Sequence, residues 1–559
     1  MADNAEAARA AAANDPEATA TLDGSDIALV AELGERRQVR PGEYLYREGD
    51  VTYDFFLLIS AEVDIVVSVD GTERVIAQHG PGRFLGELNM LTGMRVFVSA
   101  RVVEAGEVVV VPRDRLRSLM ARRPQLGDTI LAAFVARRAL LMSGAAPTTR
   151  VIGSQYSPES LRVHEFLTRT RVPHEWLDPD RDPQVEDLLR GFGIAPSELP
   201  VVIATGSVLR RPSPGELASY LGLTVESLPE RCFDLLVVGG GPAGLAAAVY
   251  GASEGLRTLG VEMTAPGGQA GTSSRIENYL GFPMGISGAD LTSRAVIQAE
   301  KFGATLTVPC TAESLHNKAG HLVVRLSDGS EIAGRAVIAA TGAAYRRLEA
   351  ARLGDFEGNG VYYAATEMES RMCAGAPVTV VGGGNSAGQA AIFLSQGGSA
   401  VNLVIRGSDL TKSMSRYLVE RIEVDPLITL RTCTIVTALE GDETLQSLRL
   451  AAPEGETVVE CAGLFSFIGA DPSSGWLSGC AALDERRFVL TDLSLAPDQL
   501  DEGWETLGRL PLPFETSHSG LFAVGDLRAG STKRVAAAVG EGSAAVRSVH
   551  EHLAFSTRS

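Results

Sequence analysis

The stretch Asp234-Leu-Leu-Val-Val-Gly-Gly-Gly-Pro-Ala-Gly244 decides the fold of the C-terminal part of this chain. Its run of Leu and Val indicates a buried strand, and the residues that follow it indicate a helix over Leu245–Ser253. Between strand and helix, glycines stand at Gly239, Gly241 and Gly244. In this pattern the first glycine permits a tight turn, the second lets the backbone approach a pyrophosphate, and the third lets helix and strand pack closely.

An acidic residue completes the pattern. Glu262 ends the next predicted strand, Arg257–Glu262, at close to the roughly 20-residue spacing at which an acid binds a ribose hydroxyl. Backbone amides at the start of the helix favour negative phosphate charge. The sequence therefore predicts a dinucleotide site, with a ligand-free glycine turn as the alternative interpretation.

A second glycine fingerprint follows further along the chain. It consists of Gly382, Gly384 and Ala387, after a predicted strand at Val378–Val381. The next strand ends at Arg406 rather than at an acid. Because an arginine there suits the 2′-phosphate of NADPH and an acid would suit NADH, this fingerprint favours NADPH. An ordinary surface charge is the alternative reading of Arg406.

Composition limits the remaining possibilities. The 559 residues are 45% hydrophobic and include 60 glycines, which predicts three to five domains. A net charge of -19 argues against nucleic acid as a partner, because phosphate binding needs clustered cations. No leader or membrane-spanning run is found, so we expect a cytoplasmic protein, and residues 1–22 are expected to be a disordered tail. Six scattered cysteines form no Cys-x-x-Cys and predict no metal site.

Further motifs lie at fixed places around the two fingerprints. They are Pro266-Gly-Gly-Gln269, Ile276-Glu-Asn-Tyr-Leu-Gly-Phe-Pro283, Ala339-Ala-Thr-Gly342, Gly520-Leu-Phe-Ala-Val-Gly-Asp526 and Lys533-Arg-Val-Ala-Ala-Ala-Val-Gly-Glu-Gly542. With the second fingerprint inserted inside the first domain, this region resembles the low-molecular-weight thioredoxin reductase family. The resemblance implies FAD and NADPH as cofactors, hydride transfer from NADPH to the flavin, and a homodimer.

The resemblance also implies domain limits and contacts. Residues 232–347 and 463–559 would form an FAD domain, and residues 348–462 an NADPH domain. Besides the first fingerprint and Glu262, the residues implied to contact FAD are Gly268, Gln269, Asn278, Thr341, Gly342, Asp526, Val535 and Ala536.

The family's redox dithiol is missing from this chain. Aligned on the second glycine turn, family members have Tyr-Cys-Ala-Thr-Cys-Asp where this chain has Tyr363-Ala-Ala-Thr-Glu-Met368. Without the two sulfurs at Ala364 and Glu367, electrons cannot pass to a protein disulfide by thiol–disulfide exchange. We expect them to leave from the flavin, to a quinone, dioxygen, an iron–sulfur protein or a second redox protein. Glu367 is a candidate proton donor, and a solvent-facing glutamate is its alternative reading.

The N-terminal region, residues 23–143, has a different pattern of predicted secondary structure. Short evenly spaced strands separated by turns, followed by two helices, predict a small β-barrel or jelly roll. The stretch Arg83-Phe-Leu-Gly-Glu-Leu-Asn-Met-Leu-Thr-Gly-Met-Arg95 resembles the phosphate-binding cassette of cyclic nucleotide-binding domains, with Gly86, Glu87 and Arg95 as ligand candidates. Val96 occupies the family's arginine position and Phe97 would crowd a phosphate. A different small ligand, or none, competes with a nucleotide.

Residues 150–224 alternate strands and helices. They resemble a thioredoxin- or glutaredoxin-like module in which Leu199-Pro200 corresponds to the family's cis-proline, but they contain no cysteine. We interpret the module as a spacer or docking platform, with a generic α/β insert as the alternative.

The chain is therefore predicted to be multidomain: a cyclic nucleotide-binding-like β-barrel with helices, a thioredoxin-like α/β module, and two Rossmann-like α/β domains. The first functional hypothesis is an FAD-dependent, NADPH-oxidising enzyme with an unknown acceptor and N-terminal regulatory modules. The second is a ligand-regulated redox sensor with little turnover. The third is a thioredoxin-disulfide reductase that uses distant cysteines.

Overall fold

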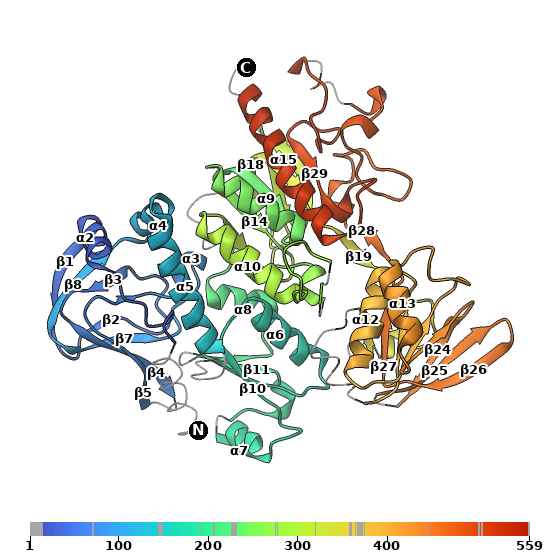
Figure 1. Ribbon diagram of the computed structural model, residues 1–559, viewed down its shortest axis with the longest axis horizontal. Helices are drawn as coiled ribbons and strands as arrows, with labels where there is room; N and C mark the ends of the chain where they lie inside the picture. The colour runs from blue at the N-terminus through green and yellow to red at the C-terminus, as the bar shows by residue number, and fades with distance from the viewer. Residues whose placement is uncertain are drawn as a thin grey trace. The chain divides into compact units, whose positions relative to one another are not determined.

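The computed structural model describes residues 15–556 apart from short gaps. The gaps are 70–71, 143–148, 192, 205–206, 225–231, 274, 277, 319, 357–359, 364, 366–369, 371–372, 374, 443, 501–503 and 505–506. The chain forms two compact units. Unit 1 contains Met1–Arg231, Gly251–Ala265 and Ile297–Thr311, and unit 2 contains the rest. Figure 1 labels many of the helices and strands named below.

The N-terminal domain consists of two antiparallel four-stranded sheets followed by two helices (Figure 1). One sheet has the order β1-β8-β3-β6 and the other β2-β7-β4-β5. The strands are β1 (Glu35–Val39), β2 (Tyr44–Tyr46), β3 (Phe55–Leu58), β4 (Glu62–Val69), β5 (Thr72–His79), β6 (Phe84–Leu85), β7 (Ser99–Glu104) and β8 (Gly106–Val111). The helices are α2 (Gly24–Leu33), α3 (Asn89–Thr92), α4 (Arg113–Arg122) and α5 (Pro124–Leu140). This confirms the predicted β-rich domain closed by helices.

Two details of this domain differ from the sequence predictions. The tail predicted to be disordered through residue 22 is structured from Asp15 onward, because Ala18 and Leu22 are buried and the amide of Leu22 donates to the carbonyl of Gly82 at 2.9 Å. The pattern of short strands predicts one at residues 96–104, but this strand, β7, begins at Ser99, since the amide of Val96 donates to the carbonyl of Asp50 outside the sheet. Tertiary contacts, which the local pattern does not contain, decide both differences.

The small module is a mixed four-stranded sheet with the order β10-β9-β11-β12. Its elements are β9 (Thr149–Ile152), α6 (Pro158–Arg169), β10 (His174–Leu177), α7 (Pro183–Gly191), η2 (Pro196–Glu198), β11 (Val201–Ala204), β12 (Ser207–Arg210) and α8 (Pro214–Leu221). Strands β9 and β10 are parallel, and β11 is antiparallel to both β9 and β12. Serine side chains cap α6 and α8, which explains where these helices begin. The Leu199-Pro200 peptide bond is cis, as predicted.

A seven-stranded sheet carries the first glycine fingerprint. Its order is β15-β14-β13-β18-β17-β16, and β29 pairs with β18. Its strands are β13 (Cys232–Val238), β14 (Thr258–Val261), β15 (Thr305–Thr307), β16 (Ala312–Lys318), β17 (His321–Leu326), β18 (Glu331–Ala339) and β29 (Leu521–Ala523). The helices are α9 (Pro242–Ser253), α10 (Gly288–Lys301) and α15 (Val535–Ser556), with short turns η4 (Ala270–Thr272), η6 (Gly475–Leu477), η7 (Asp492–Ser494), η8 (Pro497–Gln499) and η9 (Gly525–Leu527).

A five-stranded parallel sheet, β20-β27-β21-β22-β23, carries the second fingerprint. Its elements are β20 (Val361–Tyr362), β21 (Val378–Val381), α12 (Asn385–Gln396), β22 (Val401–Val404), α13 (Arg416–Val424), β23 (Ile428–Arg431) and β27 (Gly463–Ser466), preceded by η5 (Leu353–Asp355). The antiparallel sheet β24 (Ile435–Gly441), β25 (Leu445–Ala452) and β26 (Gly455–Glu460) is inserted before β27. Strands β19 (Ala343–Tyr345) and β28 (Ala470–Pro472) pair where the chain enters and leaves this domain.

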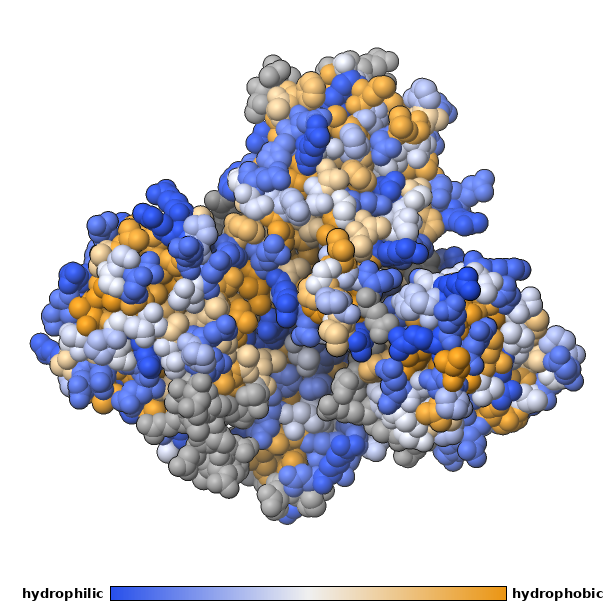
Figure 2. Space-filling model, in the orientation of Figure 1, coloured by the Kyte–Doolittle hydropathy of each residue, from blue (hydrophilic) through white to orange (hydrophobic). Residues whose placement is uncertain are grey.

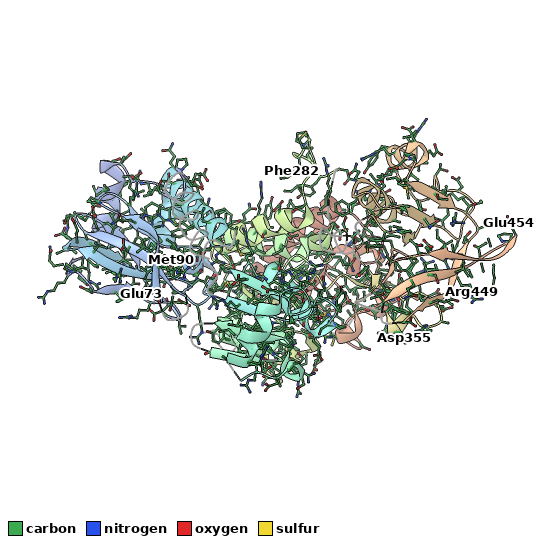
Figure 3. The ribbon with its side chains drawn as sticks, turned by 90° about the horizontal axis from the view of Figure 1, so that it is seen from below. Glu73, Met90, Phe282, Asp355, Arg449 and Glu454 are labelled. Atoms are coloured by element: carbon green, nitrogen blue, oxygen red, sulfur yellow. The ribbon has the colours of Figure 1, made fainter. Side chains whose placement is uncertain are left out.

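Exposed charge marks the outer sheet of this domain. Arg449 on β25 pairs with Glu440 at 2.6 Å and with Glu456 at 3.7 Å. Figure 3 shows Arg449 and Glu454 at the outer end of the β25–β26 hairpin. On the face drawn in Figure 2, hydrophilic and apolar residues are interspersed over the molecule. Charged side chains on an exposed hairpin keep it solvated and disfavour its pairing with a strand of another chain.

One buried carboxyl predicts a pH dependence of stability. Burial raises the pKa of Glu300 to about 7, although Arg138, Arg117, Arg113 and Arg171 oppose the shift. The folded state binds the proton of Glu300 more tightly than the unfolded state does. Protonated Glu300 therefore adds to the free energy of unfolding; this stabilisation is complete below pH 4.5 and is lost as pH rises through 7.

We therefore expect Glu300→Gln to flatten the decline in the free energy of unfolding between pH 6 and pH 8 by about 1 kcal/mol. Urea unfolding at the two pH values measures this difference. Glu313→Gln, an exposed site on β16, is the matched control. Equal pH slopes in the wild type and Glu300→Gln would contradict the assignment.

Candidate functional site

Two glycines of the first fingerprint are required for packing. Gly239 follows β13 with φ +110°, and a Cβ on it would lie 2.3 Å from the carbonyl oxygen of Ala340. A Cβ on Gly244 would lie 1.8 Å from the carbonyl oxygen of Gly239. No side chain fits at either distance, so these glycines let α9 start directly against the sheet.

The middle glycine instead faces open space. The nearest heavy atom to a Cβ on Gly241 would be the Cα of Gly268, at 3.9 Å. Gly268 has φ +53°, and the amide of Gly267 donates to the carbonyl of Gly240 at 2.7 Å. Two glycine turns thus meet at the start of the 12-residue helix α9 and leave a cradle that a side chain would fill. This cradle fits a pyrophosphate, since helix amides and close backbone approach are what such a group needs.

Glu262 follows β14, which is the neighbour of β13 in the sheet. Its Oε1 accepts a hydrogen bond from the amide of Thr264 at 3.0 Å. Its own amide donates to the carbonyl of Thr307 and its carbonyl accepts from the amide of Cys310. The carboxylate is therefore fixed at the carboxyl end of the strand next to the fingerprint, where the sequence predicts a ribose-binding acid.

Gln269, Thr341 and Gly342 lie together where the chain crosses to the second-fingerprint domain. The side chain of Gln269 donates to the carbonyl of Ala343. The hydroxyl of Thr341 donates to the carbonyl of Ser473 at 2.8 Å, and the amide of Ser473 donates to Gly342. The structure thus brings three sequence-predicted residues together, and the side chains of Gln269 and Thr341 are each held by a hydrogen bond to a backbone carbonyl.

Asp526 follows β29 in the turn η9. Burial raises the pKa of its carboxyl, and Glu541 adds to the shift while Lys533 opposes it. Among the described residues this carboxylate has no hydrogen-bond partner, so it remains available to a ligand hydroxyl. A Cβ on neighbouring Gly525 would lie 3.0 Å from the Cβ of Ala243, which places the Asp526 turn against helix α9.

Helix α15 approaches the same region. A Cβ on Gly542 would lie 2.0 Å from the carbonyl oxygen of Ala243, so α15 packs tightly on α9. Val535 is half-buried and Ala536 is exposed, both in the first turn of α15. They therefore lie where the amides of a 22-residue helix are free to face a ligand.

Asn278 occupies a different environment from the other predicted residues. It is exposed, in a loop closed by the Ile276–Ile286 bridge. Leu280 and Met284 in this loop are 93% and 78% exposed, and Figure 3 shows Phe282 on a projecting tip. Asn278 would need a ligand or a movement of the loop to acquire a contact.

The second fingerprint repeats the division of roles found in the first. Gly382 has φ +146°, and its Cβ would lie 2.4 Å from the carbonyl oxygen of Phe467. A Cβ on Gly384 would meet nothing within 4 Å, and α12 begins at the next residue. Ala387 is fully buried under the helix. The space in front of Gly384 suits the pyrophosphate of a second dinucleotide.

The cation predicted to recognise a 2′-phosphate follows β22, the strand next to β21 in the sheet. Arg406 follows β22 and is exposed, and its guanidinium has no partner among the described residues. Lys412 is also exposed, whereas Arg416 pairs with Glu420 at 2.8 Å. Two cations are therefore available to a phosphate at the end of β22.

Sequence reasoning missed Asn385. Its Oδ1 accepts from the amide of Ser415 at 2.6 Å and from the Ser415 hydroxyl at 3.0 Å. The Ser413 hydroxyl donates to the carbonyl of Gly383 at 2.8 Å. These bonds fix the 413–415 segment beside the fingerprint. The sequence signal that could have identified Asn385 is its place directly after the glycine turn, because asparagine side chains often form hydrogen bonds with nearby backbone groups.

The thiols do not form a redox pair in the described part of the chain. None of the six cysteines forms a disulfide. Burial raises the pKa of Cys461 to about 11 and also raises that of Cys480, which makes these thiols poor nucleophiles. Cys373 is buried in the core of the second-fingerprint domain. The candidate proton donor Glu367, like Ala364, lies outside the described residues.

In the N-terminal cassette, the predicted ligand residues are held by protein groups. Gly86 has φ +153° and would place a Cβ 2.6 Å from the ring of Phe134. Glu87 is buried in an ion pair with Arg138 on α5, including a 2.8 Å bond from Nη2 to Oε2. Arg95 donates to the carbonyls of Gly49 and Tyr220. Glu87 and Arg95 therefore already have partners in this structure.

Among the described residues there is no group of three or more His, Cys, Asp or Glu that could hold a metal ion. No helix in the same residues is both long and apolar enough to cross a bilayer.

Comparison with known families assigns two regions. Residues 233–542 match the pyridine nucleotide-disulphide oxidoreductase model, and residues 36–123 match the cyclic nucleotide-binding domain model.

Among curated proteins, NADPH-dependent thioredoxin reductase 3 from Arabidopsis thaliana is 32% identical over 57% of this chain. This chain spans 58% of the length of that protein. Thioredoxin reductase from Listeria innocua is 29% identical over 58% of this chain and 95% of its own length.

Solved structures give the same result. Thioredoxin reductases of Lactococcus lactis and T. acidophilum each match 58% of this chain and 99% of their own, at 26% identity, with TM-scores of 0.50 and 0.51. Together with the two glycine cradles, these matches show that the chain belongs to the pyridine nucleotide-disulphide oxidoreductase family and is, by family, an FAD-dependent NAD(P)H oxidoreductase carrying an N-terminal cyclic nucleotide-binding domain.

Proposed function

We propose that this protein oxidises NADPH with FAD and delivers the electrons to an acceptor that is not a protein disulfide. The observation that carries the proposal is the pair Ala364 and Glu367, which stand where the family has its two cysteines. FAD supplies the hydride-accepting chemistry when bound. Thiol–disulfide exchange needs a thiolate close to a second sulfur, and none of the six cysteines is joined to another in a disulfide.

The chain's own residues would bind and orient the two nucleotides. The Gly241 and Gly384 cradles would admit the two pyrophosphates, and Glu262 would accept from a ribose hydroxyl of FAD. Asp526, whose carboxylate has no hydrogen-bond partner among the described residues, would accept from the ribityl chain. The amides at the start of α15 would face the flavin end of the cofactor. The roles assigned to the individual residues, the domain limits, the homodimer and the cytoplasmic location remain predictions.

An anaerobic titration tests the proposal. We expect the purified yellow protein to lose its flavin absorbance with about one equivalent of NADPH, and a quinone or an iron–sulfur protein to restore it. Wild-type protein that turns over rapidly with thioredoxin and insulin would contradict the proposed acceptor class. Bleaching that no acceptor, including air, reverses would favour the sensor hypothesis instead.

The nucleotide preference gives a separate prediction. Arg406→Ala should raise the KM for NADPH roughly tenfold or more, because a charge-assisted hydrogen bond contributes about 1.5–3 kcal/mol. The KM for NADH should stay within about twofold, since NADH lacks the 2′-phosphate. Steady-state kinetics with ferricyanide as the acceptor measure both values. Arg325→Ala, at an exposed site on β17, is the control, and equal changes in both KM values would remove the basis for the NADPH assignment.

A further inference from the structure

The N-terminal domain contains a cavity of about 70 Å³ that the flavin chemistry does not use. Apolar side chains from the β4 and β5 strands, α5 and the chain around them form most of its wall, among them Tyr46, Ile65, Ile76, Leu85 and Leu141. In Figure 3, the labels of Glu73 at the start of β5 and of Met90 in α3 locate this domain. All of the lining residues belong to unit 1.

The cassette groups that would bind a cyclic phosphate are not available to this cavity. Glu87 borders it, but Arg138 binds both of its carboxylate oxygens. Phe97 packs on the Arg138 guanidinium, at 5.0 Å from the ring centroid, and so supports that pair. Arg95 is not among the lining residues, and backbone carbonyls hold its guanidinium. A phosphate diester would therefore lack its expected cation.

A different cation lines the cavity. Arg137 on α5 donates through Nε to the carbonyl of Ala18 at 3.0 Å and through Nη1 to that of Gly86 at 2.8 Å. Its Nη2 is buried and has no partner among the described residues. No carboxylate pairs with it in that part of the chain, and burial lowers its pKa to about 10. Two backbone carbonyls, the ring of Phe84 at 4.8 Å from the guanidinium carbon, and the charge of Glu87 offset only part of the cost of burying this cation. A ligand anion at Nη2 would offset more of that cost.

A second polar group faces the same space. His79, at the end of β5, is only 4% exposed, and its Nδ1 has no partner among the described residues. Burial lowers the pKa of this imidazole well below its usual value, so the ring is neutral at pH 7 and can donate one hydrogen bond. An unpaired donor of Arg137 and a neutral histidine therefore line one mostly apolar cavity.

The volume limits the ligand. At roughly 10–15 Å³ per water position, the cavity holds on the order of six waters, which in the liquid occupy about 180 Å³. That space suits an organic molecule of about ten non-hydrogen atoms. The purine, ribose and phosphate of a cyclic nucleotide would bring many polar groups against a mostly apolar wall.

We propose that this cavity binds a medium-chain carboxylic acid. The carboxylate pairs with Nη2 of Arg137 and accepts from His79, while the hydrocarbon chain lies among Tyr46, Ile65 and Ile76. Nε and Nη1 of Arg137 keep their bonds to Ala18 and Gly86, so binding requires no loss of an existing contact. Ala18 and Arg137 lie outside the matched residues 36–123, whereas Gly86 and Glu87 lie within them, so the cavity combines cassette residues with segments on either side of the match.

Isothermal titration of the full-length protein with octanoate tests the site. We expect one octanoate to bind per chain, and octanamide, which has the same shape without the charge, to bind at least tenfold more weakly. cAMP and cGMP should bind more weakly than octanoate. A cyclic nucleotide that binds more tightly than octanoate, or an amide that binds equally well, would overturn the proposal.

Two variants locate the binding. Arg137→Gln should weaken octanoate binding at least tenfold, but it also removes bonds to Ala18 and Gly86 and could lower stability. Ala77→Phe therefore keeps the charge and fills the cavity from β5, and it should also abolish binding. Arg36→Gln, whose side chain is 60% exposed, should bind like the wild type. Unchanged affinity in a folded Ala77→Phe protein would show that octanoate binds elsewhere.

Discussion

Gly241→Ala should give a folded protein that binds FAD roughly 100-fold more weakly, a loss of about 2.7 kcal/mol. The nearest protein atom to the added methyl lies 3.9 Å away, so the fold tolerates it. The methyl would instead occupy the cradle between the Gly241 and Gly268 turns, where the pyrophosphate must approach the backbone. The ratio of flavin absorbance to protein absorbance after dialysis, with near-ultraviolet circular dichroism as the test of folding, measures the effect.

Two neighbouring glycines act as controls. Gly244→Ala should yield little folded protein, because its Cβ would lie 1.8 Å from a backbone oxygen that cannot move without displacing β13. Gly384→Ala adds the same methyl to the second cradle, so it should retain FAD and raise the KM for NADPH. If Gly241→Ala copurified with a full complement of FAD, the cofactor would not lie at this turn.

The second large effect concerns the missing sulfurs. We expect the wild type to show background rates of NADPH oxidation with thioredoxin and insulin, and the double variant Ala364→Cys/Glu367→Cys to show at least a tenfold higher rate. A Cys-x-x-Cys pair supplies the thiolate that attacks a disulfide and the second sulfur that resolves the mixed disulfide. The measurement is NADPH oxidation at 340 nm with and without thioredoxin.

The single variants separate this chemistry from general effects of substitution. Ala364→Cys and Glu367→Cys each provide one sulfur, which cannot complete the exchange, so both should remain at background. Titration of the double variant with a thiol reagent before and after NADPH would count the sulfurs reduced. An active wild type would mean that distant cysteines carry the electrons and would revive the third hypothesis.

Much of the fold could be predicted from short stretches of sequence. Strands β13 and β21, the glycine turns after them, and the helices that follow are encoded within about fifteen residues each, because turn, capping and packing requirements act locally there. The same is true of the cis bond before Pro200, and of the capped helices of the small module. The absence of a dithiol needs no structure at all, since composition and position alone show it.

From its sequence alone, this chain could be assigned two dinucleotide fingerprints, and Ala364 and Glu367 could be placed where the resembled family has its cysteine pair, because both features depend on residue types at fixed local spacing. Three features could be seen only in the folded chain: which glycine of each turn has open space beside it, the ion pair of Arg138 with Glu87 across 51 positions of the chain, and the cavity that Arg137 and His79 line together. These features depend on contacts between segments that are far apart along the chain. A local sequence pattern does not predict which distant side chain will pack against it.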